Sequence, residues 1–323
     1  MKKPYRNQMK IVIKATPKTL FETQKPPLTL RSPLFYVGDK YKLMPQLKPL
    51  FPAHIKRFIE PFVGGGSSFL NTPAKEYLLN DINPYLINLH QSLITQDFNN
   101  FLNSMLTKIQ AYGLSCSFIG HLPPLPLRQD HKKTYFAKYN KNAYKRLRAD
   151  FNAHKQDMRS LYLLLIYGFN HMLRFNSKGD FNLPVGNVDF NRNVVGALKA
   201  YFERTKTQKL LFSCLDFRDF LGKIAFQKGD FVYCDPPYLI SGSEYNKLWS
   251  IEQEKNLYAI LRALDAKGVA WGFSNLATHK RQENPLLLAF AKNYKIFEIQ
   301  SNYITKSLKS KAITSVLKII ANV

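Results

Sequence analysis

Short apolar runs that end in polar, glycine-rich or proline-rich turns recur along the chain. Such runs end at Ile59, Leu79, Phe212 and Cys234, and another covers residues 268–275. Short apolar runs bounded by turn signals are typical of strands buried inside a parallel sheet. Two more segments, 294–303 and 312–321, predict a closing pair of strands. The pattern predicts an α/β fold, with ligands bound beyond the carboxyl ends of its strands.

The stretch between Asp81 and Asp235 is far longer than one crossover between parallel strands needs, which predicts an inserted domain. It holds a proline-rich loop at 123–126 and a basic helix at 132–152 that contains Lys132 and Lys133. A hairpin follows around Ser-Lys-Gly-Asp at 177–180, and it carries Arg174, Asn176, Lys178 and Asn182. Arg and Asn on a hairpin can reach base edges, although a polar surface hairpin is the simpler alternative.

Composition strengthens the case for a nucleic-acid partner. The 323 residues carry a formal net charge of +25 at a pI near 9.8, and 45% of them are hydrophobic. The chain can therefore bury a core, and its charge calls for a polyanion. A solvated basic surface or a membrane-surface protein are the alternatives, but aromatic residues, 14% of the chain, lie among the Lys and Arg.

The cysteines and the amino terminus bear on the compartment. Cys116, Cys214 and Cys234 are isolated and odd in number, which argues against a zinc site or a disulfide framework and favours a reducing, cytoplasmic location. Apolar runs are too short to span a bilayer. Residues 1–30 form a basic arm that either touches phosphates or is simply solvated.

Asp235-Pro236-Pro237-Tyr238 is the strongest chemical signal, since it directly follows a predicted strand. Proline fixes φ and donates no ladder hydrogen bond, so the strand ends there and holds an acid and an aromatic rigidly. The Asp235 carboxylate and the Pro236 carbonyl could accept both hydrogens of a planar amine and draw its lone pair out of conjugation. Tyr238 could stack on the ring. The plainer alternative is a strand that ends in a proline turn.

Upstream, a glycine-rich turn and two acids suit a nucleotide-like ligand. Gly64, Gly65 and Gly66 follow a strand and precede a helix for which Ser67 is the expected N-cap. Asp81 ends the next strand, at the distance where an acid meets ribose hydroxyls, or it forms an Asx turn before the helix at Pro84. Asp216 ends another strand and could equally cap a helix at Phe217.

In this order these segments resemble the Dam-like, D12-class α group of DNA adenine-N6 methyltransferases. Asp-Pro-Pro-Tyr resembles the family's motif IV, the glycine turn its motif I, and Gly38 with Lys40 its motif X, where Phe35-Tyr36 and Asp39 depart from the usual pattern. The hairpin resembles the family's target-recognition segment, as do residues 144–152. The match covers about residues 31–250.

The resemblance implies a role for each matching residue. Catalysis falls to Asp235, Pro236, Pro237 and Tyr238. S-adenosylmethionine would contact Tyr36, Lys40, Glu60, Phe62, Gly64, Gly66, Asp81, Asp216 and Phe217, with Lys40 on the cofactor carboxylate. Double-stranded DNA would contact Arg174, Asn176, Lys178 and Asn182, and the dominant positive charge of the basic helix separately predicts phosphate contacts at Lys132 and Lys133. No metal is needed.

The resemblance also implies an architecture and a reaction. A Rossmann-like methyltransferase core with a mixed, mostly parallel sheet, at 31–110 and 205–323, would hold a helical and hairpin target-recognition insert at 111–204. The expected reaction is methyl transfer to the N6 amine of an adenine flipped out of DNA, in a restriction-modification system with a possible partner endonuclease. An N4-cytosine methyltransferase and an inactive DNA-binding module remain alternatives. The recognition sequence and the oligomeric state stay open.

Overall fold

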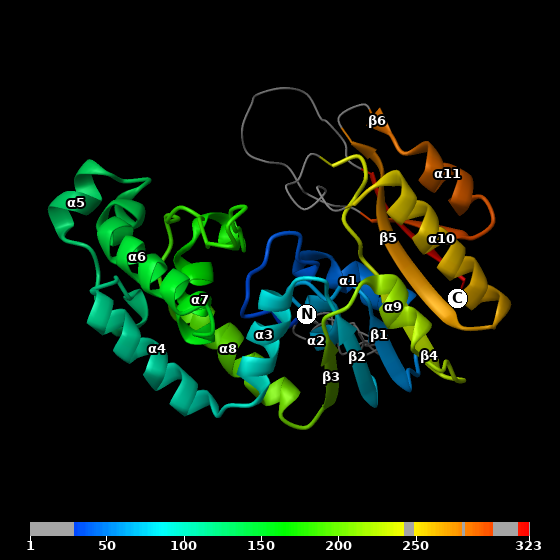
Figure 1. Cartoon of the computed structure of the whole chain (residues 1–323), viewed down its shortest axis with the longest axis horizontal. Helices are drawn as coiled ribbons and strands as arrows, with labels where there is room; N and C mark the ends of the chain where they lie inside the picture. Colours follow the sequence, from blue (N-terminus) through cyan, green and yellow to red (C-terminus); the bar gives the residue numbers. More distant parts are fainter. Residues whose placement is uncertain (1–28, 242–248, 280–281, 300–315, 323) are drawn as a thin grey trace, which may run out of the picture.

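The computed structural model describes residues 29–241, 249–279, 282–299 and 316–322 and is built around one mixed sheet (Figure 1). Its strand order is β3-β2-β1-β4-β5-β8-β7, with β6 paired to β5. Neighbours from β3 to β5 are parallel, whereas β8 is antiparallel to β5 and β7. The strands are β1 (Arg57–Glu60), β2 (Glu76–Asn80), β3 (Lys209–Ser213), β4 (Asp230–Cys234), β5 (Ala270–His279), β6 (Gln282–Glu283), β7 (Lys295–Ile299) and β8 (Val316–Ala321). The predicted mixed, mostly parallel sheet is confirmed.

The central strands are apolar throughout because both faces of the sheet are covered. Along β4, Phe231 and Tyr233 belong to one hydrophobic core, and Val232 and Cys234 belong to the other. Alternate side chains of a strand point to opposite faces, so two buried faces need an unbroken apolar run. This is why the run before Asp235 shows no alternation of polar and apolar residues.

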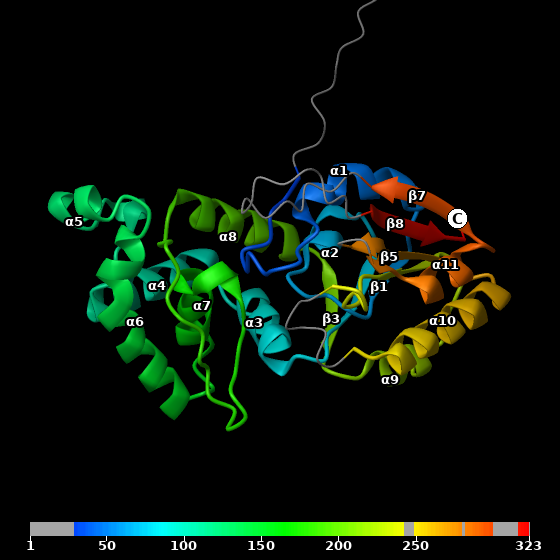
Figure 2. The same cartoon turned by 90° about the horizontal axis from the view of Figure 1, so that it is seen from above.

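Helices form a layer on each face of the sheet (Figure 2). One layer includes α1 (Met44–Leu47), α2 (Ser67–Asn71), α3 (Pro84–Ile94) and α8 (Arg192–Thr205). The other has α9 (Phe217–Gly222), α10 (Ile251–Ala266) and α11 (Pro285–Ala291). Short 3-10 turns are η1 (Tyr41–Leu43), η2 (Lys48–Leu50), η3 (Ser117–Ile119) and η4 (Phe169–His171).

The remaining helices gather at the end of the molecule away from α10 and α11 (Figure 1). They are α4 (Phe98–Tyr112), α5 (Leu125–Asp130), α6 (Tyr135–Ala153) and α7 (Met158–Tyr167). Every residue of α7 from Ser160 to Tyr167 is buried, because α3, α4 and α6 all pack against it. The long stretch between Asp81 and Asp235 therefore contributes a helical unit of α4 to α7, whose buried residues share one core with one face of the sheet.

Three predicted element boundaries are wrong. The basic helix begins at Tyr135, because residues 131–134 form a turn that leaves Lys132 and Lys133 ahead of it. The proline-rich loop gives way to α5 at Leu125, since proline is tolerated in the first turn of a helix. Gly66, not Ser67, is the N-cap of α2.

The predicted closing strands are antiparallel, as β7 and β8. The other residues predicted for them, 300–303 and 312–315, lie outside the described residues, as does the arm from 1 to 28. The chain also forms a hairpin turn at 176–180, where Asn182 donates its amide hydrogen to Arg174 and Phe175 bridges to Phe181.

Candidate active site

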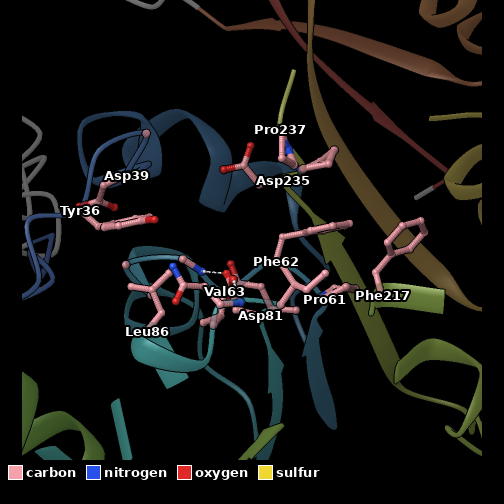
Figure 3. A pocket seen from close by; sticks show the side chains of 18 of the residues that line it. Tyr36, Asp39, Pro61, Phe62, Val63, Asp81, Leu86, Phe217, Asp235 and Pro237 are labelled. Atoms are coloured by element: carbon pink, nitrogen blue, oxygen red, sulfur yellow. Dashed lines mark hydrogen bonds between the residues drawn. The ribbon is translucent and has the colours of Figure 1, made fainter. Parts of the chain in front are cut away.

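A cavity of about 430 Å³ opens at the carboxyl ends of β1, β2 and β4. Every residue predicted to be catalytic or to contact the cofactor lines it, although these residues come from segments spread between Tyr36 and Tyr238. Figure 3 shows Asp235 and Asp81 on facing walls, with Tyr36 at one end and Phe217 at the other. The parallel topology brings them together, because successive strands end at the same edge of the sheet.

The glycine-rich turn forms the wall nearest β1, and its shape depends on glycine. Gly66 has φ 83°, and a Cβ there would lie 2.4 Å from the ring of Phe69. The carbonyl of Gly64 is held by His90 Nε2 at 2.9 Å, while His90 Nδ1 lies 2.9 Å from the hydroxyl of Tyr201. Burial lowers the pKa of His90 to about 4, so the imidazole is neutral and Nε2–H donates to the turn.

Asp81 ties this turn to the end of β2. Its Oδ2 accepts from the amide of Gly64 at 3.0 Å, and its Oδ1 accepts from the amide of Asn83 at 2.9 Å. The second bond is the Asx turn that was the alternative interpretation, whereas Asn83 itself caps α3. Burial raises the pKa of Asp81, and the two backbone hydrogen bonds oppose that rise. Each carboxylate oxygen keeps a lone pair with which it could accept a hydrogen bond from a hydroxyl group.

Glu60, at the end of β1, presents an unsatisfied acceptor to the same cavity. Its side chain is buried, and Oε2 accepts no hydrogen bond from a described residue. Burial raises the pKa of Glu60 well above its usual range, and the nearby Asp235 carboxylate adds to the rise, whereas Ser68 and Lys40 oppose it. A buried acceptor without a donor is costly, so this oxygen is suited to a ligand that donates hydrogen bonds.

Asp235 is held by two partners on the opposite wall. Lys40 forms an ion pair with its Oδ2, and the hydroxyl of Tyr238 donates to its Oδ1 at 2.9 Å. Lys40 also donates to the carbonyl of Gly38 at 2.9 Å and lies 5.3 Å from the Tyr238 ring centre. Lys40 therefore neutralises Asp235 here, whereas the family resemblance implied that it would bind the carboxylate of the cofactor.

The far end of the cavity is aromatic. The rings of Phe62 and Phe217 lie 5.4 Å apart, and both contact Trp249, which sequence reasoning missed. Asp216 lines this end but also caps α9, accepting from the amide of Arg218 at 2.9 Å and pairing with its guanidinium at 2.8 Å. The helix-cap alternative for Asp216 is thus present in the structure.

The hairpin residues predicted to read bases contact one another. Arg174 donates from Nε to Asn182 Oδ1 and from a terminal nitrogen to the Asn182 carbonyl, both at 2.9 Å. Asn176 Oδ1 accepts from the amides of Lys178 and Asp180 at 2.9 Å each and so builds the turn. Lys178 is exposed, as are Lys132 and Lys133 in the turn before α6.

The hairpin is also fastened to α6. Arg148 donates to the carbonyl of Leu183 at 3.1 Å, and the Asn152 amide exchanges hydrogen bonds of 2.8 and 3.1 Å with the backbone of Phe181. These contacts hold the hairpin in one place on the helical unit.

A mostly parallel sheet that carries a glycine turn and Asp-Pro-Pro-Tyr at one edge defines a Rossmann-like methyltransferase. The chain belongs to the D12 class N6 adenine-specific DNA methyltransferase family, whose model matches residues 36–319. Among the described residues, no helix has both the length and the apolar character needed to cross a membrane.

Several named proteins are similar to this chain in sequence. The chain is 32% identical to type II methyltransferase M.FokI of Planomicrobium okeanokoites over 86% of its length, and 29% identical to modification methylase StsI of Streptococcus sanguinis over 91%. It spans only 40% and 43% of those two proteins. It is also 32% identical to a DNA adenine methylase of Vibrio cholerae, over 64% of this chain and 65% of that protein.

Proposed function

We propose that this protein transfers a methyl group from S-adenosylmethionine to the N6 amine of adenine in double-stranded DNA, in the cytoplasm. The observation that carries the proposal is the cavity. Asp-Pro-Pro-Tyr forms one of its walls, and the glycine-rich turn forms the other together with Glu60 and Asp81. Family membership and the names of the relatives support it.

The cavity fits the proposed methyl donor at several points. Glu60 offers a buried acceptor to a donor such as an ammonium, and Asp81 offers acceptors to ribose hydroxyls. Phe62 and Phe217 supply flat apolar surface for a purine. When bound, S-adenosylmethionine supplies an electrophilic methyl group.

The residues on the other wall act on the target amine. A paired adenine keeps its amine inside the duplex, so the base has to flip out to reach Asp235. The Asp235 carboxylate and the Pro236 carbonyl then accept the two amine hydrogens and stabilise the positive charge that develops on nitrogen. Tyr238 stacks on the base. Lys40 and Tyr238 each use one acceptor position of Asp235, so each carboxylate oxygen keeps a lone pair for the incoming amine.

We propose that residues 111–204, which include α5, α6, α7 and the hairpin, recognise DNA, with phosphates on Lys132 and Lys133 and bases on the hairpin. The support is a formal charge of +25, exposed lysines at the start of α6, and a hairpin fastened in one position. One relative is named a modification methylase and another a type II methyltransferase, which supports a restriction-modification role with a partner endonuclease.

The test is methyl transfer from labelled S-adenosylmethionine to DNA, with the product identified after digestion to nucleosides. We expect N6-methyladenine, and Asp235→Ala should slow single-turnover transfer by about 10²–10³-fold or more while DNA affinity is largely kept. Asp219→Ala, which removes an exposed acid outside the cavity, is the control and should leave the rate unchanged. N4-methylcytosine as the product, or an Asp235→Ala rate near that of wild type, contradicts the proposal.

A further inference from the structure

Glu254 is a fully buried acid that the proposed reaction does not use. It lies in the first turn of α10 and accepts four hydrogen bonds. Oε1 accepts from the Tyr258 hydroxyl at 2.6 Å, from Asn275 at 2.8 Å and from Asn284 at 3.2 Å. Oε2 accepts from the indole N–H of Trp249 at 2.6 Å. One carboxylate thus joins α10 to β5 and to the N-cap of α11.

The bond to Trp249 replaces a common apolar contact. Ser250 is the N-cap of α10, so Trp249 precedes the cap and Glu254 is the fourth helical residue. These two positions usually hold a pair of hydrophobic side chains that fix how the chain enters a helix. Here they hold a donor and an acceptor. An apolar pair would fix the approach of the chain, whereas the hydrogen bond also fixes the rotation of the indole ring.

The orientation of Trp249 matters because this ring is part of the cavity wall. It stands edge-on to Phe62, at 5.6 Å and 83°, and it lies 5.5 Å from Phe217. Polar acceptors lie beside this aromatic surface. Asp216 lines the same end, and the buried Oε1 of Gln253 accepts no hydrogen bond from a described residue. Flat apolar rings beside acceptors suit a purine with an exocyclic amine.

We propose that Glu254 is a positioning residue that holds Trp249 as a wall for the purine of the methyl donor. This inference rests on the proposed function, since it takes S-adenosylmethionine as the ligand. Glu254 itself touches neither the ligand nor the reacting atoms. Replacing it by Gln keeps its size but turns an N–H₂ group towards one set of donors, so the Trp249 N–H or the Asn and Tyr donors lose their acceptor.

The test uses fluorescence, because the chain has only two tryptophans, Trp249 and Trp271. In a Trp271→Phe background, all tryptophan fluorescence comes from Trp249. We expect S-adenosylmethionine and adenosine both to quench it, and Glu254→Gln to raise both dissociation constants by about the same factor, roughly tenfold. In steady-state transfer, the KM for S-adenosylmethionine should rise by that factor while kcat at saturation changes little. Glu252→Gln, on the exposed face of the same turn, should match wild type.

A double-mutant cycle separates positioning from general stability. If Glu254 acts through the indole, Glu254→Gln should add little further loss in a Trp249→Phe background, which has no N–H to hold. All four variants of the cycle are compared by isothermal calorimetry, because Trp249→Phe removes the fluorescent reporter. The Trp249→Phe variant alone should already bind both ligands more weakly, and it serves if Glu254→Gln fails to fold. Additive losses, or weaker binding of S-adenosylmethionine without weaker binding of adenosine, overturn the assignment while the proposed function stands. A wild-type protein that binds no S-adenosylmethionine overturns both.

Discussion

The polar side chains of the cavity and those of the hairpin differ in whether the protein itself satisfies their hydrogen bonds. In the cavity, the buried Oε2 of Glu60 and Oε1 of Gln253 accept nothing from described residues, and Asp81 keeps lone pairs towards the open space. In the hairpin, Arg174 and Asn182 satisfy each other, and Asn176 is used by the backbone of its own turn. One region presents acceptors to a ligand, whereas the other uses its polar groups to hold its own shape.

The difference indicates which site is formed before its ligand arrives. An unpaired buried acceptor costs about 1–3 kcal/mol, and the cavity is already shaped to bear that cost in the absence of ligand. The hairpin bears no such cost, because Asn182 already accepts from two of the five N–H donors of Arg174, and the other three remain for a base. We therefore expect the methyl donor to bind without DNA.

The first prediction tests the cavity at Asp81. Asp81→Ala should weaken S-adenosylmethionine binding in DNA-free protein, because two hydroxyls would lose a charged acceptor worth roughly 1.5–3 kcal/mol for each bond. Isothermal calorimetry measures the change. Asp97→Ala is a matched control, since Asp97 also accepts from two backbone amides but caps α4 outside the cavity. If both variants lose only stability, Asp81 is a turn residue.

The second prediction tests the hairpin at Arg174. If Arg174 reads a base, Arg174→Ala should relax the preference at one base position by about 1–3 kcal/mol. Methylation rates on a library of single-base variants of the site measure this preference. Arg148→Ala is the control, because Arg148 fastens the hairpin to α6 without a predicted base contact. A common drop at every base position, as expected for Arg148→Ala, would make Arg174 a structural residue.

The sequence predicts the features that are set by residues close together in the chain. The glycine turn and Asp-Pro-Pro-Tyr each form within a few residues, and strand order then brings them to one edge. The partners of these side chains come from distant segments. Lys40 reaches Asp235 across 195 positions, and Glu254 gathers donors from β5 and the N-cap of α11. No local pattern records such pairs.

The hairpin shows the same limit at short range. Its turn and position were predictable from Ser-Lys-Gly-Asp, but Arg174 and Asn182 look equally suited to a base and to each other. Once the two arms of the hairpin come together, these two side chains are neighbours, and each forms hydrogen bonds with the other. The start of α6 was misplaced because lysine favours helices and residues 131–134 contain no glycine or proline to mark the turn.

The third prediction sharpens the description of the cavity through pH. Because burial raises the pKa of Glu60, the carboxyl binds a proton above pH 4.5 that the unfolded chain would release, and the stability of ligand-free protein should fall as pH rises towards the raised pKa. A bound ammonium favours the ionised form, so binding should release a proton and affinity should rise with pH by at most about tenfold per unit. Glu60→Gln should remove both slopes.

Calorimetry in buffers of different ionisation enthalpy counts the released proton directly. Glu283→Gln serves as the control, since Glu283 is exposed on β6 and lies outside the cavity lining. A wild-type protein that binds S-adenosylmethionine with no proton release would show that Glu60 does not face the cationic group of the donor.

The last prediction concerns affinity without specificity. Lys132 and Lys133 are exposed in the turn before α6, so they can reach phosphates without breaking any hydrogen bond of the hairpin. Changing both to Ala should weaken binding to every sequence alike, by a few-fold at moderate salt, and should flatten the salt dependence by about one unit of slope for each phosphate that is no longer neutralised. The measurement is DNA affinity at several salt concentrations, on DNA with and without the recognition site.

Lys223 and Lys228, changed together, are the matched control, because both are exposed near the amino-terminal end of β4, opposite Asp235. If the two pairs lower affinity equally, the effect is one of net charge alone. If only the Lys132 and Lys133 pair changes the slope, and the ratio of specific to non-specific affinity stays constant, that turn binds phosphate and discrimination lies elsewhere in the helical unit.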